Sequence, residues 1–311
     1  MCRAPNEGVF VMGSWKALFV ASGAVIGMAG LANAADLLPP APAVEPAPPA
    51  AVEYSGWYLR GDVGLGINTG NTTMTIVPNP LIGLPADAFN SFYNPTISAS
   101  GIFDIGVGYQ FNNWLRFDVT GEYHGGSQFQ VLEQVGIPST STQFADWYRG
   151  SLSSYILMAN GYVDIGTWYG MTPFVGAGVG WAQNHLDGMT DTGFAYVGPG
   201  STGSPTGGFL NNGVTNNLAW ALMAGLDFDV TQNLKLELGY RFLDIGQVKS
   251  GVSNCFNGTA ANGGFSVANC GGSGFLLKTN NETEQDVRIG LRWLLSDVPS
   301  YAPPSPIVTR Y

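Results

Sequence analysis

The feature that most constrains this fold is a strict alternation of apolar and polar residues on both sides of Asn112 and Asn113. Between Gly101 and Tyr123, nearly every second residue is apolar. A period of two points successive side chains to opposite faces of an extended backbone, so the segment predicts two β-strands. Asn tolerates the positive φ of a tight turn, and the two strands should form a hairpin. Each arm has about ten residues, enough for a tilted strand to cross a bilayer.

The second face of this hairpin indicates whether the hairpin belongs to a soluble protein or to a membrane barrel. It carries Asp104, Gln110, Arg116, Asp118 and Glu122, with glycines between them. A soluble sandwich would also have one apolar face, but charge opposite it is typical of the interior of a membrane barrel. Glycines on the inner face would leave room for long side chains from the opposite wall.

The same alternation recurs along the chain and predicts eight strands, at 57–67, 103–111, 115–123, 155–165, 174–181, 220–230, 234–242 and 286–293. The connections alternate between long and short. The long ones carry no sustained strand pattern and are expected to be loops, at 68–100, 124–154, 183–217 and 245–283. The predicted fold is therefore all-β, an eight-stranded antiparallel up-and-down transmembrane β-barrel with extracellular loops and tight periplasmic turns.

An even strand count places both ends of the barrel on one side of the membrane, the periplasm. Closure is required because an open sheet edge in hydrocarbon would leave backbone donors and acceptors unpaired. The first and last strands should therefore pair. Aromatic residues near the predicted strand ends, such as Trp57, Tyr109, Tyr123, Trp181 and Trp293, fit two interfacial girdles. Ordinary core packing is the other explanation for them.

The composition fits a wall that faces lipid and excludes a nucleic-acid binder. Charged residues make up 11% of the chain, against roughly 25% in typical soluble domains. The chain has 44 glycines and is 12% aromatic. Its net charge of −10 leaves no basic surface to neutralise phosphates.

The termini predict processing and flexible tails around the barrel at 54–295. Residues 1–34 resemble a signal peptide, with Lys16 before an apolar run and a small-residue cleavage motif ending at Ala34. Translation from Met12 would give a signal of ordinary length, and the run is too short to favour a transmembrane helix. Residues 35–53 are rich in Pro and Ala and predict a periplasmic tether. Residues 296–311 predict a periplasmic Pro-rich tail.

Two of the three cysteines are expected in the exported protein, because Cys2 lies in the leader. Cys255 and Cys270 form an even pair in a Gly- and Asn-rich stretch, and in an oxidising periplasm they most simply form one disulfide. No histidine lies beside them, since His124 and His185 are in other segments, so a metal site is not expected there.

Charged residues on the inward face form the strongest constellation in the sequence. Charges enclosed in a narrow wall must pair, so a salt-bridged plug is expected, with a narrow ion pathway as the alternative. The predicted lumen network consists of Arg60, Asp62, Asp104, Arg116, Asp118, Glu122, Asp164, Asp227, Asp229, Lys235, Glu237, Arg241, Asp286, Arg288 and Arg292.

Two stretches of the sequence resemble catalytic motifs, but neither fits the chemistry it suggests. Gly176–Gly180 is glycine-rich, but a phosphate loop must leave a strand and open a helix, and these glycines keep the strand alternation. His124, Glu122 and Ser127 invite a hydrolase interpretation, as in lipid-modifying barrels. Spacing places Glu122 inward and His124 at the start of a loop, so a surface histidine is expected, and His185 is similar. No catalytic residue, cofactor or metal is predicted.

Four motifs resemble those of a known family, at 57–64 (WYLRGDVG), 106–118 (GVGYQFNNWLRFD), 173–180 (PFVGAGVG) and 238–242 (LGYRF). They resemble the small outer-membrane β-barrel proteins of Gram-negative bacteria, including the outer-membrane immunogenic or surface-antigen proteins, the porin family and OmpA-type eight-stranded barrels. Many such barrels end on an aromatic in the last strand, whereas this chain continues beyond Trp293. Which C-terminal segment acts as the assembly signal therefore stays open.

The pattern and the resemblance together predict an outer-membrane protein that serves envelope structure and surface exposure through its long loops. Expected partners are outer-membrane lipid and lipopolysaccharide, the barrel-assembly machinery, and host or environmental ligands at the loops, with no nucleic acid. The alternatives are a small porin for ions or very small solutes and a lipid-modifying enzyme that uses His124. In a lipocalin-like soluble binder, the remaining alternative, the apolar face would line the cavity.

Overall fold

The computed structural model describes residues 55–70, 72–259 and 264–295. These form strands almost throughout, with a single 3-10 turn, η1 (Pro138–Thr140). None of the helical segments in these residues is long and apolar enough to cross a membrane. The expected signal peptide (1–34), tether (35–53) and tail (296–311) lie outside the described residues.

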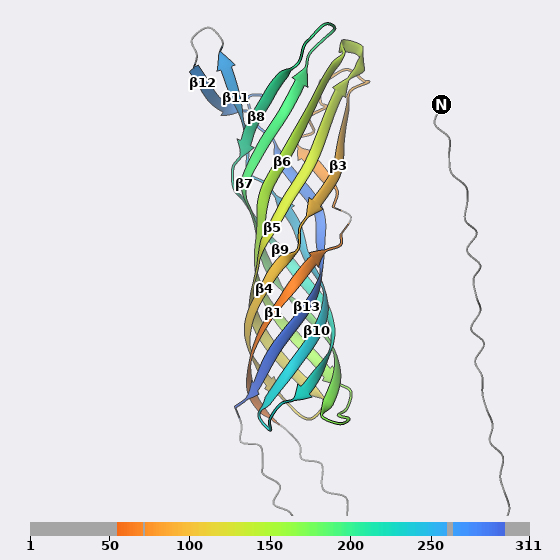
Figure 1. Cartoon of the computed structure of the whole chain (residues 1–311), viewed down its shortest axis with the longest axis vertical. Helices are drawn as coiled ribbons and strands as arrows, with labels where there is room; N and C mark the ends of the chain where they lie inside the picture. The colour runs from red at the N-terminus through yellow and green to blue at the C-terminus, as the bar shows by residue number, and fades with distance from the viewer. Residues whose placement is uncertain (1–54, 71, 260–263, 296–311) are drawn as a thin grey trace, which may run out of the picture. The chain divides into compact units, whose positions relative to one another are not determined.

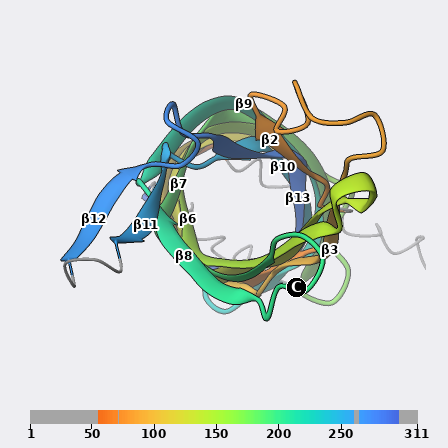
Figure 2. The same cartoon turned by 90° about the horizontal axis from the view of Figure 1, so that it is seen from above.

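Eight strands form a closed antiparallel ring, which Figure 2 shows from above. Each is paired with a neighbour on both sides, and β1 pairs with β13, so the predicted eight-stranded barrel and its closure are confirmed. The ring consists of β1 (Gly56–Asn68), β4 (Ser100–Gln110), β5 (Leu115–Ile137), β6 (Thr142–Asp164), β7 (Met171–Tyr196), β9 (Gly213–Asp229), β10 (Leu234–Lys249) and β13 (Leu276–Leu294).

The register closes the ring without a gap. Val63 of β1 lies opposite Ile289 of β13 on one side and Phe103 of β4 on the other, with all three side chains on the outer face. β1 pairs with each of these neighbours over eleven consecutive residue positions. Hydrogen bonds between neighbouring strands around the whole ring pair the backbone N–H and C=O groups, which would find no partner in the hydrocarbon of a membrane.

The four long connections, which are predicted to be loops, contain β-strands. Several ring strands continue far beyond their predicted ends, and Figure 1 shows them rising above the rest of the barrel. We call this the long-hairpin end, and the opposite end, with its tight connections, the short-turn end. Five further strands belong to the long-hairpin end, namely β2 (Met74–Val77), β3 (Phe89–Ile97), β8 (Ser204–Leu210), β11 (Ser253–Thr259) and β12 (Gly264–Asn269).

A change of face hides these extensions from the sequence pattern. Along β5 the register shifts between His124 and Ser127, where Gly126 has a φ of +80°. Such a bulge inserts one residue and exchanges the two faces. Beyond it, Phe129 and Val131 point inward and are buried, while Gln128 is exposed. The alternation of apolar outside and polar inside therefore reverses, and the segment no longer resembles a lipid-facing strand.

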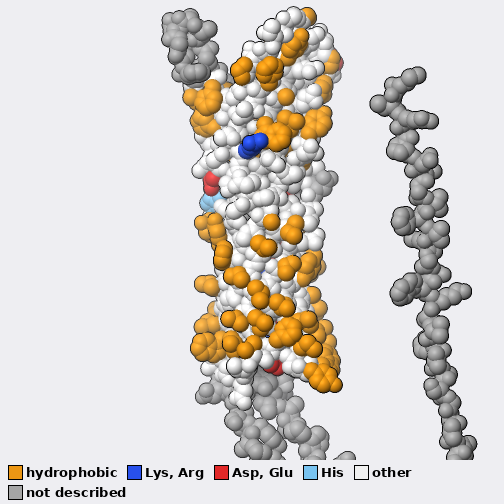
Figure 3. Space-filling view, viewed as in Figure 1, with side chains coloured by type: hydrophobic (Ala, Val, Ile, Leu, Met, Phe, Trp, Pro, Cys, Tyr) orange, Lys and Arg blue, Asp and Glu red, His pale blue; other side chains and the backbone are white. Residues whose placement is uncertain are grey.

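The outer face carries aromatic residues at two levels. Towards the short-turn end, Trp57, Tyr109, Phe111 and Phe117 pack edge to face in sequence, with centroid distances between 4.9 and 5.5 Å. Tyr123 and Tyr155 form a second level, 5.2 Å apart, and Trp220 and Phe242 form another pair at 5.4 Å. Figure 3 shows hydrophobic side chains gathered over the lower part of the barrel wall. These levels correspond to the girdles expected at the two membrane interfaces.

The interior has charged residues towards the short-turn end and apolar residues towards the long-hairpin end. The apolar layer is one buried cluster of Met74, Ile76, Phe129, Val131, Tyr148, Leu152, Leu186, Met189, Leu210, Val248 and Leu277. In the charged layer, inward glycines make room for long side chains of adjacent strands. A Cβ at Gly108 would overlap the ring of Tyr58, and one at Gly106 would lie 3.1 Å from Cγ of Arg60.

Candidate functional site

Arg116 lies at the centre of the charged layer of the lumen. Its side chain is fully buried and reaches three carboxylates, Asp164 at 3.2 Å, Glu237 at 3.2 Å and Asp227 at 3.7 Å. Its guanidinium also lies over the rings of Tyr162 (4.2 Å) and Phe174 (4.7 Å). Because these residues come from β5, β6, β7, β9 and β10, this one side chain links the walls of the barrel.

Arg60 of β1 connects further carboxylates to the same network. Its guanidinium lies 2.8 Å from Asp62, 2.9 Å from Asp118 and 2.9 Å from Glu237. It also donates to the hydroxyl of Tyr162 at 2.9 Å. Glu237 therefore bridges Arg60 and Arg116 across the lumen, an arrangement in which every charge has a partner of opposite sign.

The other arginines extend the network along β13 and β10. Arg288 pairs with Asp62 and Asp104, and Arg292 pairs with Asp227. Further towards the long-hairpin end, Arg241 pairs with Asp286 at 2.7 Å and with Glu122 at 2.8 Å. The ion pairs thus continue from strand to strand around the interior.

Most of the predicted lumen network lies together in the interior. Of the fifteen residues, all are buried except Asp229 and Lys235. These two lie at the short-turn end and pair with each other at 2.7 Å, with the Asp229 side chain 40% exposed. They belong to the mouth of the barrel, because β9 ends at Asp229 and β10 begins at Leu234, and side chains at this end reach water.

The network leaves little free volume. Within it, the cavity lined by Arg60, Glu237 and Arg288 holds about 10 Å³, close to the room that a single water molecule needs. Towards the short-turn end, a cavity of about 490 Å³ is lined by Gln110, Asp229 and Lys235 among others. A cavity of about 370 Å³ lies at the long-hairpin end. The densely paired layer therefore lies between two wider mouths.

The prediction that His124 is a surface histidine is wrong. β5 continues through it, so His124 has the same inward orientation as Glu122 and is only 2% exposed. Its Nδ1 lies 2.8 Å from Oε2 of Glu284, and its Nε2 lies 3.3 Å from Oε2 of Glu122. Glu282 and Glu284, also buried, were missed by the sequence analysis because β13 extends ten residues before its predicted start.

The remaining motifs lie elsewhere. His185 is half-buried on the outer face, where its ring packs against Tyr155 at 5.5 Å. Ser127 is buried one strand position beyond the bulge. Gly176–Gly180 lies within β7 and does not lead into a helix. Cys255 and Cys270 are bonded to each other and join β11 to the residue that follows β12.

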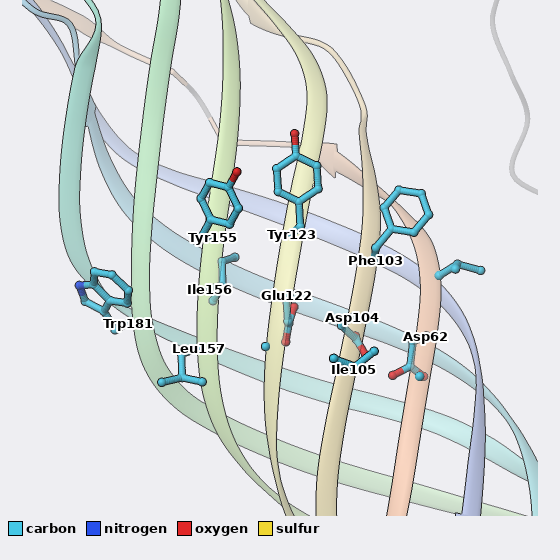
Figure 4. A pocket seen from close by; sticks show the side chains of 13 residues that line it. Asp62, Phe103, Asp104, Ile105, Glu122, Tyr123, Tyr155, Ile156, Leu157 and Trp181 are labelled. Carbon is cyan, nitrogen blue, oxygen red and sulfur yellow. The ribbon is translucent and has the colours of Figure 1, made fainter.

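A shallow hollow lies on the outer face between the aromatic side chains (Figure 4). Phe103, Tyr123, Tyr155 and Trp181 surround it, and Gly121 at its floor has nothing within 4 Å of its Cβ position. The carboxylates Asp62, Asp104 and Glu122 belong to the same strands but are buried in ion pairs on the lumen side. The hollow is thus an apolar, lipid-facing depression.

The cavity at the long-hairpin end contains three carboxylates among apolar side chains. Glu133 accepts hydrogen bonds from Tyr148 (2.9 Å) and Asn90 (2.6 Å), and Asp146 accepts one from Thr206 (3.1 Å). Burial, with a smaller contribution from Asp146, raises the pKa of Glu133 to about 7, although the hydrogen bonds from Tyr148 and Asn90 lower it. Burial, reinforced by Asp146 and Glu133, raises the pKa of Asp191 to about 7.

These shifts predict that the long-hairpin end loses stability as the pH rises from 5 to 8. A carboxyl with a higher pKa in the folded protein than in the unfolded chain binds its proton more tightly when folded. The stabilisation is complete below the unfolded pKa of about 4.5 and is lost as the pH rises through about 7. The measurement is the urea midpoint of the detergent-folded protein at pH 5 and pH 8. The Glu133→Gln variant should show a smaller difference, and an unchanged difference would contradict the prediction.

Comparison with known proteins agrees with this architecture. The model of the outer membrane protein beta-barrel domain family matches residues 40–268. The chain belongs to this family. An uncharacterized protein of Brucella abortus is 33% identical over 226 residues, which cover 69% of this chain and 76% of the relative. A putative adhesin of Rickettsia canadensis is 28% identical over 158 residues, which cover 50% of this chain and 62% of that protein. Family membership places the chain in the outer membrane.

Solved structures of small outer-membrane barrels are also similar to the chain. Neisserial surface protein A is 16% identical, with a TM-score of 0.39, and the match covers 78% of this chain and 99% of that protein. OprG from Pseudomonas aeruginosa is 12% identical, with a TM-score of 0.34 over 77% of this chain and 96% of that protein. Because both TM-scores are below 0.5, the assignment of the barrel architecture is based on the strand pairing and on the family match.

Proposed function

We propose that this family member is a surface-exposed anchor of the outer membrane whose lumen is closed by its charge network. The observation that carries the proposal is the layer around Arg116, where buried arginines and carboxylates from opposite walls pair. The cavity within this network that Arg60, Glu237 and Arg288 line holds about 10 Å³. Eight strands enclose an interior that side chains nearly fill. Such a layer holds the barrel rigid and blocks the passage of solutes.

The long-hairpin end is the surface that we assign to contact outside the cell. Outer-membrane barrels have short periplasmic turns and longer extracellular connections, which is the asymmetry seen in Figure 1. With this orientation, β1 starts and β13 ends on the periplasmic side, and both termini lie in the periplasm. The Rickettsia relative carries the name putative adhesin, which supports contact with host or environmental ligands. Lipid, lipopolysaccharide and the assembly machinery are the other partners we propose.

Planar-bilayer recording of the detergent-refolded protein tests the closed lumen. The expected result is a folded barrel, shown by heat-modifiable gel mobility, that gives no stable unitary conductance steps. Stable steps that change in Asp118→Asn, where a buried lumen carboxylate is neutralised, would overturn the proposal in favour of a small porin. Asp87→Asn is the matched control, because Asp87 is exposed at the long-hairpin end and its one hydrogen-bond partner among the described residues is Ser139 of the η1 turn.

A further inference from the structure

A second group of titratable side chains lies in the lumen at the boundary between the charged and the apolar layers. It consists of His124 of β5 with Glu284 and Asp286 of β13, all three buried. Each offers one nitrogen or oxygen atom, and the three atoms lie within 4.8 Å of one another. Imidazole and carboxylate at this spacing are the ligand types that divalent transition metals use in proteins.

The oxygens of this group converge on a position that lacks a side chain. Gly66 of β1 is the register partner of Ser100 on one side and of Asp286 on the other. A Cβ built on Gly66 would lie 2.5 Å from Oγ of Ser100, 2.9 Å from Oε2 of Glu284 and 3.0 Å from Oδ1 of Asp286. The bare glycine therefore leaves a small cradle lined by oxygen atoms from two neighbouring strands.

One of these oxygens has no hydrogen-bond partner among the described residues. Asp286 is fully buried, and its Oδ2 accepts from Nε of Arg241 at 2.7 Å, whereas its Oδ1 accepts from no donor. A buried carboxylate oxygen without a donor is costly. Because this oxygen is aimed at the Gly66 cradle, a cation bound there would supply the partner that it lacks.

The charge balance around the cradle also favours a cation. Glu122, Glu282, Glu284 and Asp286 are at most 5% exposed, and Arg241 is the guanidinium that pairs with two of them. Oε1 of Glu282, another buried oxygen, also lacks a hydrogen-bond partner among the described residues. Even with His124 counted as a second partner, for Glu122 and Glu284, four buried carboxylates leave an excess of negative charge that a divalent ion would reduce.

We propose that this group binds a divalent first-row transition-metal ion such as Zn²⁺, through Nδ1 of His124, Oε2 of Glu284 and Oδ1 of Asp286. In this arrangement Nε2 of His124 donates to Glu122, 3.3 Å away. A carboxylate behind a metal-bound histidine orients the ring and is a common feature of such sites. The imidazole ligand selects against Ca²⁺ and Mg²⁺, which prefer oxygen ligands alone. The metal would fasten β5 to β13 across β1 and β4.

The test uses Co²⁺ as a spectroscopic probe. Because the ligands are buried, the full chain is refolded in detergent with Co²⁺ present, and unbound metal is removed with a chelator. The expected result is about one equivalent of retained Co²⁺ with visible d–d absorption. His124→Gln and Asp286→Asn should lose this equivalent. His185→Gln, which removes the outer-face histidine, should keep it, and Glu122→Gln should bind roughly 10–100-fold more weakly.

Two results would overturn the proposal. The first is a folded wild-type protein that retains no Co²⁺, which would mean that His124 serves only as an ion-pair partner of Glu122 and Glu284. This result needs no variant, so it decides the question even where a substitution prevents folding. The second is retention of the metal by folded His124→Gln to the same extent as by the wild type.

Discussion

Replacing Arg116 with alanine is expected to destabilise the folded barrel by about 3–5 kcal/mol, because it leaves buried carboxylates without their counter-charge. Asp164, Glu237 and Asp227 all face this guanidinium. Glu237 and Asp227 keep other arginine partners, Arg60 and Arg292. Arg116 is the arginine that pairs with Asp164 among the described residues, so Asp164 bears most of the loss.

Equilibrium urea unfolding of the refolded protein in lipid vesicles measures this effect. Arg149→Ala is the matched control, because Arg149 is exposed and its guanidinium lies over the ring of Trp147 at 5.2 Å. An exposed cation–π contact of this kind is worth about 0.5–1 kcal/mol. Equal free energies of unfolding for the two variants would show that the network around Arg116 does not hold the barrel together.

Val119→Arg is expected to destabilise the barrel by about 2–4 kcal/mol, the cost of an arginine on the lipid face near the middle of a bilayer. Val119 points outward, is 48% exposed, and lies between the lower aromatic level at Phe117 and the upper one at Tyr123. Its register partners on β4 and β6 are Val107 and Ala159, so no carboxylate lies opposite to accept the new charge.

The expected loss of stability comes from contact with lipid, so the same substitution at an exposed apolar residue away from the lipid-facing surface serves as its control. Ile82→Arg is the matched control, because Ile82 is also apolar and 77% exposed but lies between β2 and β3 at the long-hairpin end. It should change the free energy of unfolding in vesicles by less than about 0.5 kcal/mol, as surface substitutions usually do. If both variants lost the same stability, Val119 would not face hydrocarbon.

The eight ring strands and their inward faces could be predicted from the sequence because lipid imposes a uniform rule. Where the outer face meets hydrocarbon, every second residue must be apolar, and the residues between them enter the lumen. This is why the sequence pattern places Arg60, Arg116 and Arg241 in the interior, where they are buried, and predicts that the first and last strands pair.

The extensions of the strands and the position of His124 could not be predicted, because at the long-hairpin end the two faces of the strands have different surroundings from those in the lipid-facing part of the barrel. There the outer face meets water and the inner face packs an apolar cluster around Phe129 and Leu277, so the alternation reverses. A bulge at Gly126 exchanges the faces within one strand. When the apolar residues switch from one face to the other within a strand, the alternation is interrupted. These segments therefore resemble polar loops in the sequence.

The amino-acid pattern alone predicts the eight strands of the ring, its closure, the lipid-facing side and the identity of most lumen charges, because a period of two is a local property of the chain. Which of these charges meet depends on how the strands are aligned in the folded barrel. The register of β1 with β4 and β13 brings His124, Glu284 and Asp286 to the bare position at Gly66, from segments more than 150 residues apart. Contacts between distant strands depend on register and shear, which no local pattern encodes.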